Sequence, residues 1–192
     1  MTSKFTRHPT KLSGVTVIKP VQFRDARGFF LESYNKLEFE IIGITTEYVQ
    51  DNHSCSAKGV IRGLHFQKKY AQEKIVRVVR GSIYDVVVDL RKGSSTYGSS
   101  IGVYLSDRDL TMLHIPIGFA HGFLALEETT QVIYKTSELY YPEHDAGIVW
   151  NDPALGIPWP LEEYRIEVPV LSEKDRSLPR LEDIDSPFLY TE

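Results

Sequence analysis

Short runs of β-type residues dominate the chain between residues 47 and 136, and they limit the possible folds more than any other feature. Eight runs rich in β-branched and aromatic residues follow one another at close spacing, and no helical pattern separates them. Because a parallel sheet needs crossover helices, this pattern predicts an antiparallel all-β sandwich or jelly-roll barrel. The predicted strands cover residues 47–52, 60–67, 75–80, 83–90, 101–105, 110–115, 123–126 and 131–136.

Weaker signals predict what precedes these strands. Residues 1–12 show no periodicity, and the β-branched run at residues 15–18 predicts a first or edge strand. A helix of about two turns is predicted near residues 35–43. Asn35 and Glu38 have the spacing of a capping box, Leu37 and Ile41 have the spacing of one helix face, and Gly43 stands where a helix would stop.

Glycine-containing segments predict the turns. Residues 25–28, with the sequence Asp-Ala-Arg-Gly, have turn character. The pair Gly81 and Ser82 lies between two predicted strands and predicts a tight hairpin turn, and residues 91–100 form a Gly/Ser loop.

The segment from Tyr141 onward has a different composition. Seven prolines interrupt it, and Trp150 and Trp159 supply bulky apolar anchors. We expect an irregular segment (about 141–192) that wraps across the barrel, and a short helix that begins at Ser172. The whole chain, residues 1–192, is expected to form one domain with an N-terminal arm at about residues 1–20.

Composition excludes several functional classes. The single cysteine, Cys55, excludes an intrachain disulfide, and together with the lack of a leader pattern it predicts a cytoplasmic protein. No apolar run approaches the roughly 18 residues of a membrane-spanning helix, so no membrane partner is expected. The formal net charge of −4 argues against nucleic-acid binding. An anionic ligand would therefore have to bind a local basic cluster.

Residues 62–67, Arg-Gly-Leu-His-Phe-Gln, place a guanidinium, an imidazole and an amide in one predicted strand. Lys74, residues 116–123 and Asp175 add further groups. Together they predict a polar cavity inside the barrel that holds an anionic substrate beside an acid/base pair.

Strand geometry sets a condition on this cavity. Strict alternation of side chains places Arg62 and His65 on opposite faces of their strand. Both can face one cavity only if the strand contains a bulge or bend, which we expect near Gly63.

Metal binding is the main alternative for the histidines, because jelly-roll barrels often hold a metal through several of them. His65, His114 and His121 are the candidates. His65 has no His-x-His partner, since Gly63 and Gln67 stand two positions away on either side, beyond Leu64 and Phe66, and no carboxylate is adjacent. This spacing does not favour a metal, and none is predicted.

Two further residues allow a structural or a catalytic role. Tyr134 is either a core tyrosine or a proton donor, with an ordinary pKa of about 10. Asp175, in a Ser-x-x-Asp sequence, either holds a helix end or orients the imidazole of His65. The sequence leaves both alternatives open.

Six passages in the same order resemble the dTDP-4-dehydrorhamnose 3,5-epimerase family (dTDP-6-deoxy-4-keto-hexose epimerases). They are residues 25–32, 49–54, 62–67, 72–74, 116–123 and 171–175. The resemblance implies a metal-free, cupin-like jelly-roll barrel (a double-stranded β-helix) with a few short helices and no cofactor. It also implies a homodimer that exchanges N-terminal strands, so that one subunit helps to line the site of the other.

The activity that the resemblance implies is epimerisation at carbons 3 and 5 of dTDP-4-dehydro-6-deoxy-D-glucose. The product would be dTDP-4-dehydro-L-rhamnose, formed through an enolate in dTDP-L-rhamnose biosynthesis. Carried over residue by residue, His65 is the general base, Asp175 orients it, Tyr134 is the general acid, and Lys74 stabilises the enolate oxygen. The substrate-binding residues would be Arg62, His121 and Lys174 near the diphosphate, Arg27, Glu32, Gln50 and Asn52 around the nucleotide, and Tyr140 and Asp145 beside the site. Asp85 matches a carboxylate within the barrel, and Phe23 or Phe30 would stack on the base.

Two positions depart from the family pattern. Glu73 stands where many members have a glycine before the lysine, and Asp145 stands where a longer glutamate often contacts the nucleotide. The alternatives are an epimerase that acts at one carbon, a ketoisomerase on the same scaffold, or a non-catalytic jelly roll that binds sugar nucleotides. A proton-transfer set argues against the last of these, because binding alone does not require one.

Overall fold

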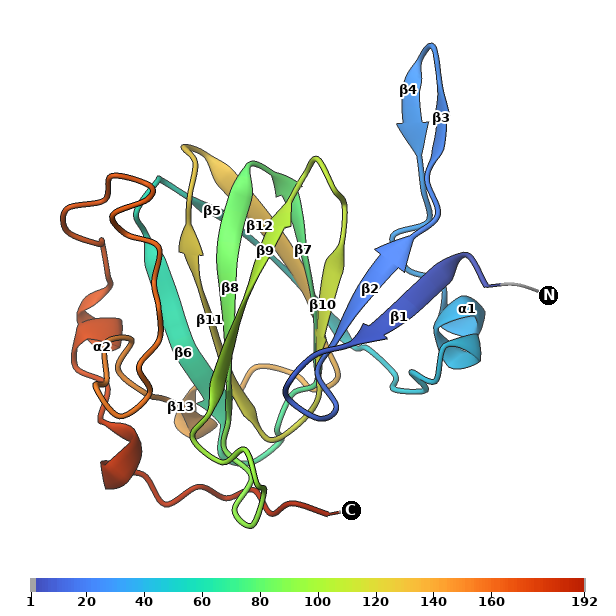
Figure 1. Ribbon diagram of the computed structural model, residues 1–192. Helices are drawn as coiled ribbons and strands as arrows, with labels where there is room; N and C mark the ends of the chain where they lie inside the picture. The colour runs from blue at the N-terminus through green and yellow to red at the C-terminus, as the bar shows by residue number, and fades with distance from the viewer. Residues whose placement is uncertain (1–2, 192) are drawn as a thin grey trace.

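The computed structural model describes residues 3–191, and two antiparallel sheets packed face to face form its body (Figure 1). In spatial order, the six-stranded sheet contains β1 (Phe5–Pro9), β2 (Thr16–Pro20), β10 (Met112–Ile115), β7 (Lys74–Arg80), β12 (Thr130–Thr136) and β5 (Gln50–Ser56). The five-stranded sheet contains β13 (Asp145–Gly147), β6 (Ile61–Gln67), β11 (Phe119–Ala125), β8 (Ser82–Asp89) and β9 (Ser100–Ser106). All strand pairings in both sheets are antiparallel. The predicted all-β jelly-roll class is confirmed.

The remaining elements are small. A separate hairpin pairs β3 (Phe23–Asp25) with β4 (Gly28–Phe30) and projects away from the barrel (Figure 1). The helices are α1 (Lys36–Ile41) and α2 (Glu173–Arg176), with two 3-10 turns, η1 (Pro142–His144) and η2 (Leu181–Asp183). Within residues 3–191, no helix has the length and apolar character needed to cross a membrane.

Alternation along β8 divides the interior of the molecule. Ile83 and Val87 belong to the core between the two sheets, whereas Tyr84 and Val86 belong to a second core on the outer face of the five-stranded sheet. Asp85 has the same orientation as Ile83 and Val87. One strand therefore supplies two apolar cores and one carboxylate that faces the barrel interior.

The tail after Tyr141 covers the outer face of the five-stranded sheet (orange to red in Figure 1). Trp150 and Trp159 pack against this face, and the indole N–H of Trp159 donates a hydrogen bond to the carbonyl oxygen of Trp150 at 2.9 Å. Val170 forms an isolated bridge with Val60. These contacts hold α2 beside the barrel.

Helix α1 confirms the helix predicted near residues 35–43. The side chain of Asn35 accepts hydrogen bonds from the backbone N–H groups of Leu37 and Glu38, and Gly43 follows the helix with a φ of +79°. The capping box is incomplete, because the Glu38 carboxylate instead accepts hydrogen bonds from Ser3 Oγ and the backbone N–H of Lys4. Glu38 thus fastens the N-terminal arm to α1.

The prediction that Leu37 and Ile41 form the apolar face of α1 is wrong. Leu37 and Ile41 are 70% and 60% exposed, and Phe39 is the residue that is buried. Phe39 packs with Phe5 of β1 and with Ile18 of β2 on the outer face of the six-stranded sheet. A helix of six residues has a single buried position here, so its spacing carried little information.

The strand predicted at residues 15–18 is confirmed as β2, but its expected position as a first or edge strand is wrong, because β1 is both. β1 precedes that run, pairs with β2 and forms the edge of the sheet. Phe5 is its only buried residue, so residues 5–9 show no apolar alternation. Hydrogen bonds between backbone groups hold such a strand whatever its side chains are.

The connection at Gly81 is also different from the prediction. β7 and β8 belong to different sheets, so Gly81 and Ser82 turn the chain from one sheet to the other and do not close a hairpin. Gly81 has a φ of +77° and its N–H donates a hydrogen bond to Asp107 at 2.8 Å. A glycine marks both kinds of turn, which is why sequence alone did not separate them.

Strand boundaries differ most where polar residues form the strand. β5 extends to Ser56 although residues 53–56 are His-Ser-Cys-Ser, and β11 begins at Phe119, four residues before the predicted start. Both strands lie against the cavity described below. Polar side chains that face a cavity interrupt the apolar pattern by which strands are predicted.

The expected bulge at Gly63 is present. Between β6 and β11, His65 pairs with His121 and Arg62 pairs with Phe123, so β6 has one residue more than β11 in this interval. Gly63 has a φ of +113°, and a Cβ atom there would lie 2.5 Å from the Cα of Gly122. Only glycine allows the two strands to approach this closely.

Replacement of Gly63 by alanine should therefore destabilise the barrel. We expect the free energy of unfolding to fall by about 2–5 kcal/mol, since a left-handed backbone costs about 1–2 kcal/mol and the overpacking about 1–3 kcal/mol. Gly93→Ala is the matched control, because Gly93 has a φ of +86° but no atom within 4 Å of its added Cβ. Urea denaturation measures both. Equal losses in the two variants would contradict the role of close packing at Gly63.

Candidate functional site

A cavity of about 330 Å³ opens between the two sheets, and most of the predicted site residues line it. His65 and His121 come from the five-stranded sheet, and Lys74 and Tyr134 come from the six-stranded sheet, so the two pairs face each other across the cavity. The tail adds groups at its mouth. The other predicted residues on its wall are Arg62, Tyr140, Asp145, Lys174 and Asp175.

His65 and Asp175 are in contact although 110 positions separate them in the chain. Nε2 of His65 lies 2.6 Å from Oδ1 of Asp175, and Asp175 is buried. Ser172 caps α2 by accepting a hydrogen bond from the backbone N–H of Asp175 at 3.0 Å. Asp175 is thus both part of a helix cap and the partner of the imidazole.

The protonation of this pair follows from its surroundings. Burial raises the pKa of Asp175, but the hydrogen bonds from His65 and Ser172 and the charge of Lys174 outweigh burial and lower the pKa overall. The ionised carboxylate accepts the Nε2–H of His65. Nδ1 of His65, which has no hydrogen bond to any residue between 3 and 191, is then the nitrogen that can take up a proton.

A second pair of histidine and carboxylate lies beside the first. His121 is the cross-strand neighbour of His65, and its Nε2 lies 2.5 Å from Oδ1 of Asp85. Asp85 is fully buried, and its Oδ2 has no hydrogen-bond partner among residues 3–191. The negative charge of Asp85 therefore acts on the interior of the cavity.

Lys74 is the half-buried cation that lines the cavity. Burial lowers the pKa of its ammonium to about 8, although the charges of Asp145 and Asp85 act in the opposite direction. An ammonium whose pKa lies near neutral pH changes its charge within the working range of most enzymes. Lys74 is therefore suited to stabilise an oxyanion in this cavity.

Tyr134 lies on the wall opposite His65. Burial raises the pKa of Tyr134; Arg62 lowers it and Asp145 raises it further, with a net upward shift. The phenol therefore stays protonated near neutral pH. It can donate a proton across the cavity from the imidazole.

Arg62 is the fixed cation at the mouth. Its Nε donates a hydrogen bond to Ser56 Oγ at 3.0 Å, and its Nη2 donates to the carbonyl oxygen of Cys55 at 3.2 Å. These bonds leave part of the guanidinium fork free to bind an anion.

Asp145 connects the other residues at the mouth. It accepts a hydrogen bond from the hydroxyl of Tyr140 at 2.8 Å and forms an ion pair with Lys174. The hydrogen bond to Asp145, together with burial, raises the pKa of Tyr140 to about 12. The shorter side chain at position 145 thus still reaches the mouth of the cavity.

Gln50 and Asn52 lie at the rim, next to Tyr140. The side-chain oxygen of Gln50 accepts a hydrogen bond from the backbone N–H of Tyr140 at 3.1 Å, and its side-chain NH₂ donates to Asn52 Oδ1 at 2.8 Å. Both side chains alternate with exposed positions of β5. They extend the polar surface from the cavity along β5.

Arg27 and Glu32 lie outside this cavity. Arg27 is on the β3–β4 hairpin, where its guanidinium pairs with Asp25 at 2.6 Å. Glu32 forms an ion pair with Lys4 and accepts a hydrogen bond from Asn35 at 2.7 Å. Within one chain, the structure does not bring these two predicted residues to His65.

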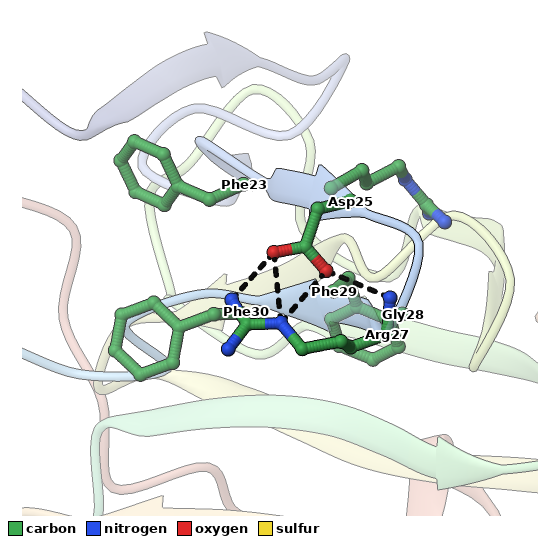
Figure 2. Close-up of a pocket in the computed structure, with 7 residues that line it drawn as sticks. Phe23, Asp25, Arg27, Gly28, Phe29 and Phe30 are labelled. Atoms are coloured by element: carbon green, nitrogen blue, oxygen red, sulfur yellow. Dashed lines mark hydrogen bonds and ion pairs between the residues drawn. The ribbon is translucent and has the colours of Figure 1, made fainter.

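The β3–β4 hairpin has its own concave surface of about 430 Å³ (Figure 2). The rings of Phe23 and Phe30 point to the same side of it, with their centroids 6.4 Å apart. Phe23, Phe29 and Phe30 are 51%, 50% and 66% exposed. Three exposed aromatic rings on one small hairpin are unusual for a surface that faces only water.

The third histidine considered as a metal ligand is not in the cavity. His114 lies on the outer face of the six-stranded sheet, where its Nε2 is 2.9 Å from Glu73. Among residues 3–191, no three His, Cys, Asp or Glu side chains are grouped to hold a metal ion.

Sequence reasoning did not single out Ser54 or Ser172, which also line the cavity. The alternation of β5 could have identified Ser54, because it shares a face with Gln50 and Asn52. Its buried Oγ has no hydrogen-bond partner among the described residues. Ser172 was predicted only as a helix cap.

Comparisons with known proteins identify the family to which this sequence and fold are similar. The model of the family described as dTDP-4-dehydrorhamnose 3,5-epimerase matches residues 9–183. The enzyme of that name from Methanothermobacter thermautotrophicus is 52% identical over 168 residues, which cover 88% of this chain and 90% of that protein. A Legionella pneumophila dTDP-6-deoxy-D-glucose-3,5-epimerase, solved in complex with dTDP-4-keto-L-rhamnose, has a TM-score of 0.92 and 40% identity over 98% of this chain and 100% of that one.

A second solved structure extends the likeness. The dTDP-4-dehydrorhamnose 3,5-epimerase from Bacillus anthracis, with TDP and PPi bound, has a TM-score of 0.87 and 48% identity over 92% of this chain and 99% of that one. The sequence match covers the strands that form the cavity and the tail that carries Asp175. This chain belongs to the dTDP-4-dehydrorhamnose 3,5-epimerase family of isomerases.

Proposed function

We propose that this chain inverts carbons 3 and 5 of dTDP-4-dehydro-6-deoxy-D-glucose and yields dTDP-4-dehydro-L-rhamnose, an intermediate of dTDP-L-rhamnose biosynthesis. The contact between His65 and Asp175 is the observation that carries the proposal. It joins an imidazole and a carboxylate in a cavity that also holds the ammonium of Lys74 and the phenol of Tyr134, which supports the proposal. A binding protein would not need these three groups together.

The carbonyl at carbon 4 of the substrate acidifies the protons on carbons 3 and 5. Nδ1 of His65 takes one of these protons, and the electron pair of the broken C–H bond moves into the ring and onto the carbon-4 oxygen, which gives an enolate. Asp175 stabilises the imidazolium that forms. Lys74 stabilises the enolate oxygen by its charge.

Tyr134 completes each inversion. Its phenol delivers a proton to the opposite face of the same carbon, which restores the ketone with inverted configuration. The two sheets place His65 and Tyr134 on facing walls, as this proton transfer requires. Solvent then restores the protonation of both residues before the second carbon reacts.

The nucleotide diphosphate would bind at the mouth. Arg62 offers a planar fork that suits phosphate oxygens, and Lys174 and His121 add positive charge or donors. Binding energy from this remote part of the substrate would orient the reacting ring.

We further propose a homodimer in which each subunit lends its β3–β4 hairpin to the site of the other. Arg27, Glu32 and the exposed rings of Phe23 and Phe30 lie too far from His65 to act in their own subunit. A partner subunit would cover the exposed rings and bring these groups to the nucleotide.

The cytoplasm is the proposed location. Cys55 is a free thiol on the surface, and such a thiol persists best in a reducing compartment.

Solvent isotope exchange tests the base. The wild-type enzyme in deuterated water should introduce deuterium at both carbons 3 and 5 of the keto sugar, as measured by NMR. His65→Ala should slow this exchange by about 100-fold or more, because the positioned base is lost. His53→Ala is a matched control, since the side chain of His53 is exposed. Among the described residues, its ring forms a hydrogen bond only with Gln131.

The exchange experiment also separates the alternatives. Deuterium at one carbon only would identify a single-carbon epimerase. Undiminished exchange in His65→Ala would exclude His65 as the base, and binding without any exchange would favour a non-catalytic binder.

The pKa of Lys74 predicts an alkaline limit to activity. The ammonium carries its charge below a pKa of about 8 and loses it above this value, so kcat/KM should fall about tenfold per pH unit above about pH 8. Asp145→Asn should move this fall to lower pH, because Asp145 raises the pKa of Lys74. Initial rates between about pH 6 and about pH 10 measure both. A flat profile over this range would contradict the role of Lys74.

Mixing two inactive variants tests the shared site. In a mixture of Arg27→Ala and His65→Ala, a mixed dimer contains one intact site if the hairpin of one subunit serves the other. Random exchange of subunits should then restore up to about a quarter of wild-type activity. If the mixture stays inactive although mass spectrometry finds mixed dimers, the hairpin acts elsewhere.

A further inference from the structure

Glu73 and Lys74 are adjacent but lie on opposite faces of the six-stranded sheet. Lys74 aligns with Val76 and Val78, which face the barrel interior, whereas Glu73 aligns with Ile75, which packs on the outer face beneath α1. The carboxylate of Glu73 is thus outside the cavity. A role in proton transfer to the substrate is excluded by its position.

Several groups fix Glu73 in place. The hydroxyl of Tyr48 donates a hydrogen bond to its Oε1 at 2.7 Å, and Nε2 of His114 lies 2.9 Å from the same oxygen in an ion-pair contact whose geometry is not that of a linear hydrogen bond. Its backbone N–H donates to Ser137 Oγ at 2.9 Å, and its carbonyl oxygen accepts from the N–H of Ser137 at 3.0 Å. Both side chain and backbone of Glu73 are therefore held.

These contacts continue into the N-terminal strands. The other ring nitrogen of His114 lies 3.3 Å from Thr16 Oγ1 on β2, and Thr16 Oγ1 accepts a hydrogen bond from Nε of Arg7 on β1 at 3.0 Å. A polar chain thus runs under α1 from β1 to the start of β7. It ends at Glu73, one residue before Lys74.

Lys74 lacks comparable support for its side chain. Its ammonium makes no hydrogen bond or ion pair with any residue between 3 and 191, and the charges that act on its pKa are the carboxylates of Asp145 on β13 and Asp85 on β8. Its position in the cavity therefore depends on where the backbone at the start of β7 directs it. The anchor of that backbone on the outer face is Glu73.

We propose that Glu73 is the positioning residue for Lys74: Tyr48 and His114 hold its carboxylate, and the fixed strand start directs the ammonium into the cavity. The inference rests on the proposed role of Lys74 at the enolate oxygen. A catalytic cation must be held close to its productive position, and the cost of a shift falls on kcat. Because Glu73 never meets the substrate, its loss should leave KM nearly unchanged.

The charged groups near Glu73 allow a test through the titration of Lys74. Burial raises the pKa of Glu73, but His114 and Tyr48 outweigh this and lower it, so Glu73 is ionised near neutral pH. The basic groups on this face include His114, Arg7, Arg77 and Lys135, and the acidic groups on the other face include Asp85 and Asp145. If the backbone at the start of β7 becomes more mobile, the ammonium of Lys74 becomes more exposed to water. The lowering of its pKa by burial then decreases.

The experiment compares Tyr48→Phe and Glu73→Gln with the wild type. Tyr34→Phe is the matched control, because the ring of Tyr34 packs 5.8 Å from that of Tyr48 but its hydroxyl has no hydrogen bond within residues 3–191. Two readouts are needed: NMR titration of lysine labelled with ¹³C, with Lys74→Arg to assign the signal, and the pH profile of kcat and KM.

In Tyr48→Phe and Glu73→Gln, Lys74 should titrate above the wild-type value of about 8 and towards about 10. The alkaline limit of activity should move up with it, and kcat near neutral pH should fall about tenfold with KM changed less than about twofold. Tyr34→Phe should match the wild type in every readout. Unchanged titration of Lys74 in both variants would overturn the proposal, even if they lost stability.

The NMR titration does not depend on turnover. A wild-type chain that exchanges no deuterium would refute the proposed function, while the titration would still show whether Glu73 holds Lys74.

Discussion

The extra residue in β6 at Gly63 is the constraint on which the cavity depends. It changes the side-chain alternation between Arg62 and His65, so that the cation at the mouth and the imidazole inside can serve one ligand. The change is possible because Gly63 and Gly122 let two backbones approach to a distance that any Cβ would prevent. Two glycines in adjacent strands thus decide which side chains line the cavity.

The site consists of charges that the fold has removed from water and only partly paired. Asp85 is fully buried with one oxygen unpaired, and the ammonium of Lys74 has no direct partner among residues 3–191. Such groups cost stability, and the apolar cores on both faces of the five-stranded sheet offset this cost. In the proposed reaction, these charges would already be oriented when the enolate forms, so little reorganisation would accompany the proton transfer.

Sequence reasoning predicted the parts that follow a local rule. The all-β class, helix α1 with its Asn35 cap and the bulge at Gly63 follow from periodicity, capping and alternation. β1 and the turn at Gly81 were not predictable in this way, because backbone pairing and sheet crossing leave no side-chain pattern. The contact of His65 with Asp175 could not be predicted by a local rule, because it depends on the path of the whole tail. The polar chain around Glu73 joins five separate segments, and no motif contains it.

Helix α2, which carries Asp175, has only four residues, and irregular chain surrounds it. Its contact with β6, where Asp175 meets His65, holds it less firmly than the hydrogen-bond ladders hold the barrel strands. Short elements of this kind open at a lower free energy than the core. On warming, the imidazole should therefore lose its carboxylate while the sheets remain intact. The upper temperature of catalysis would then be set by detachment of this helix, below the melting temperature of the barrel.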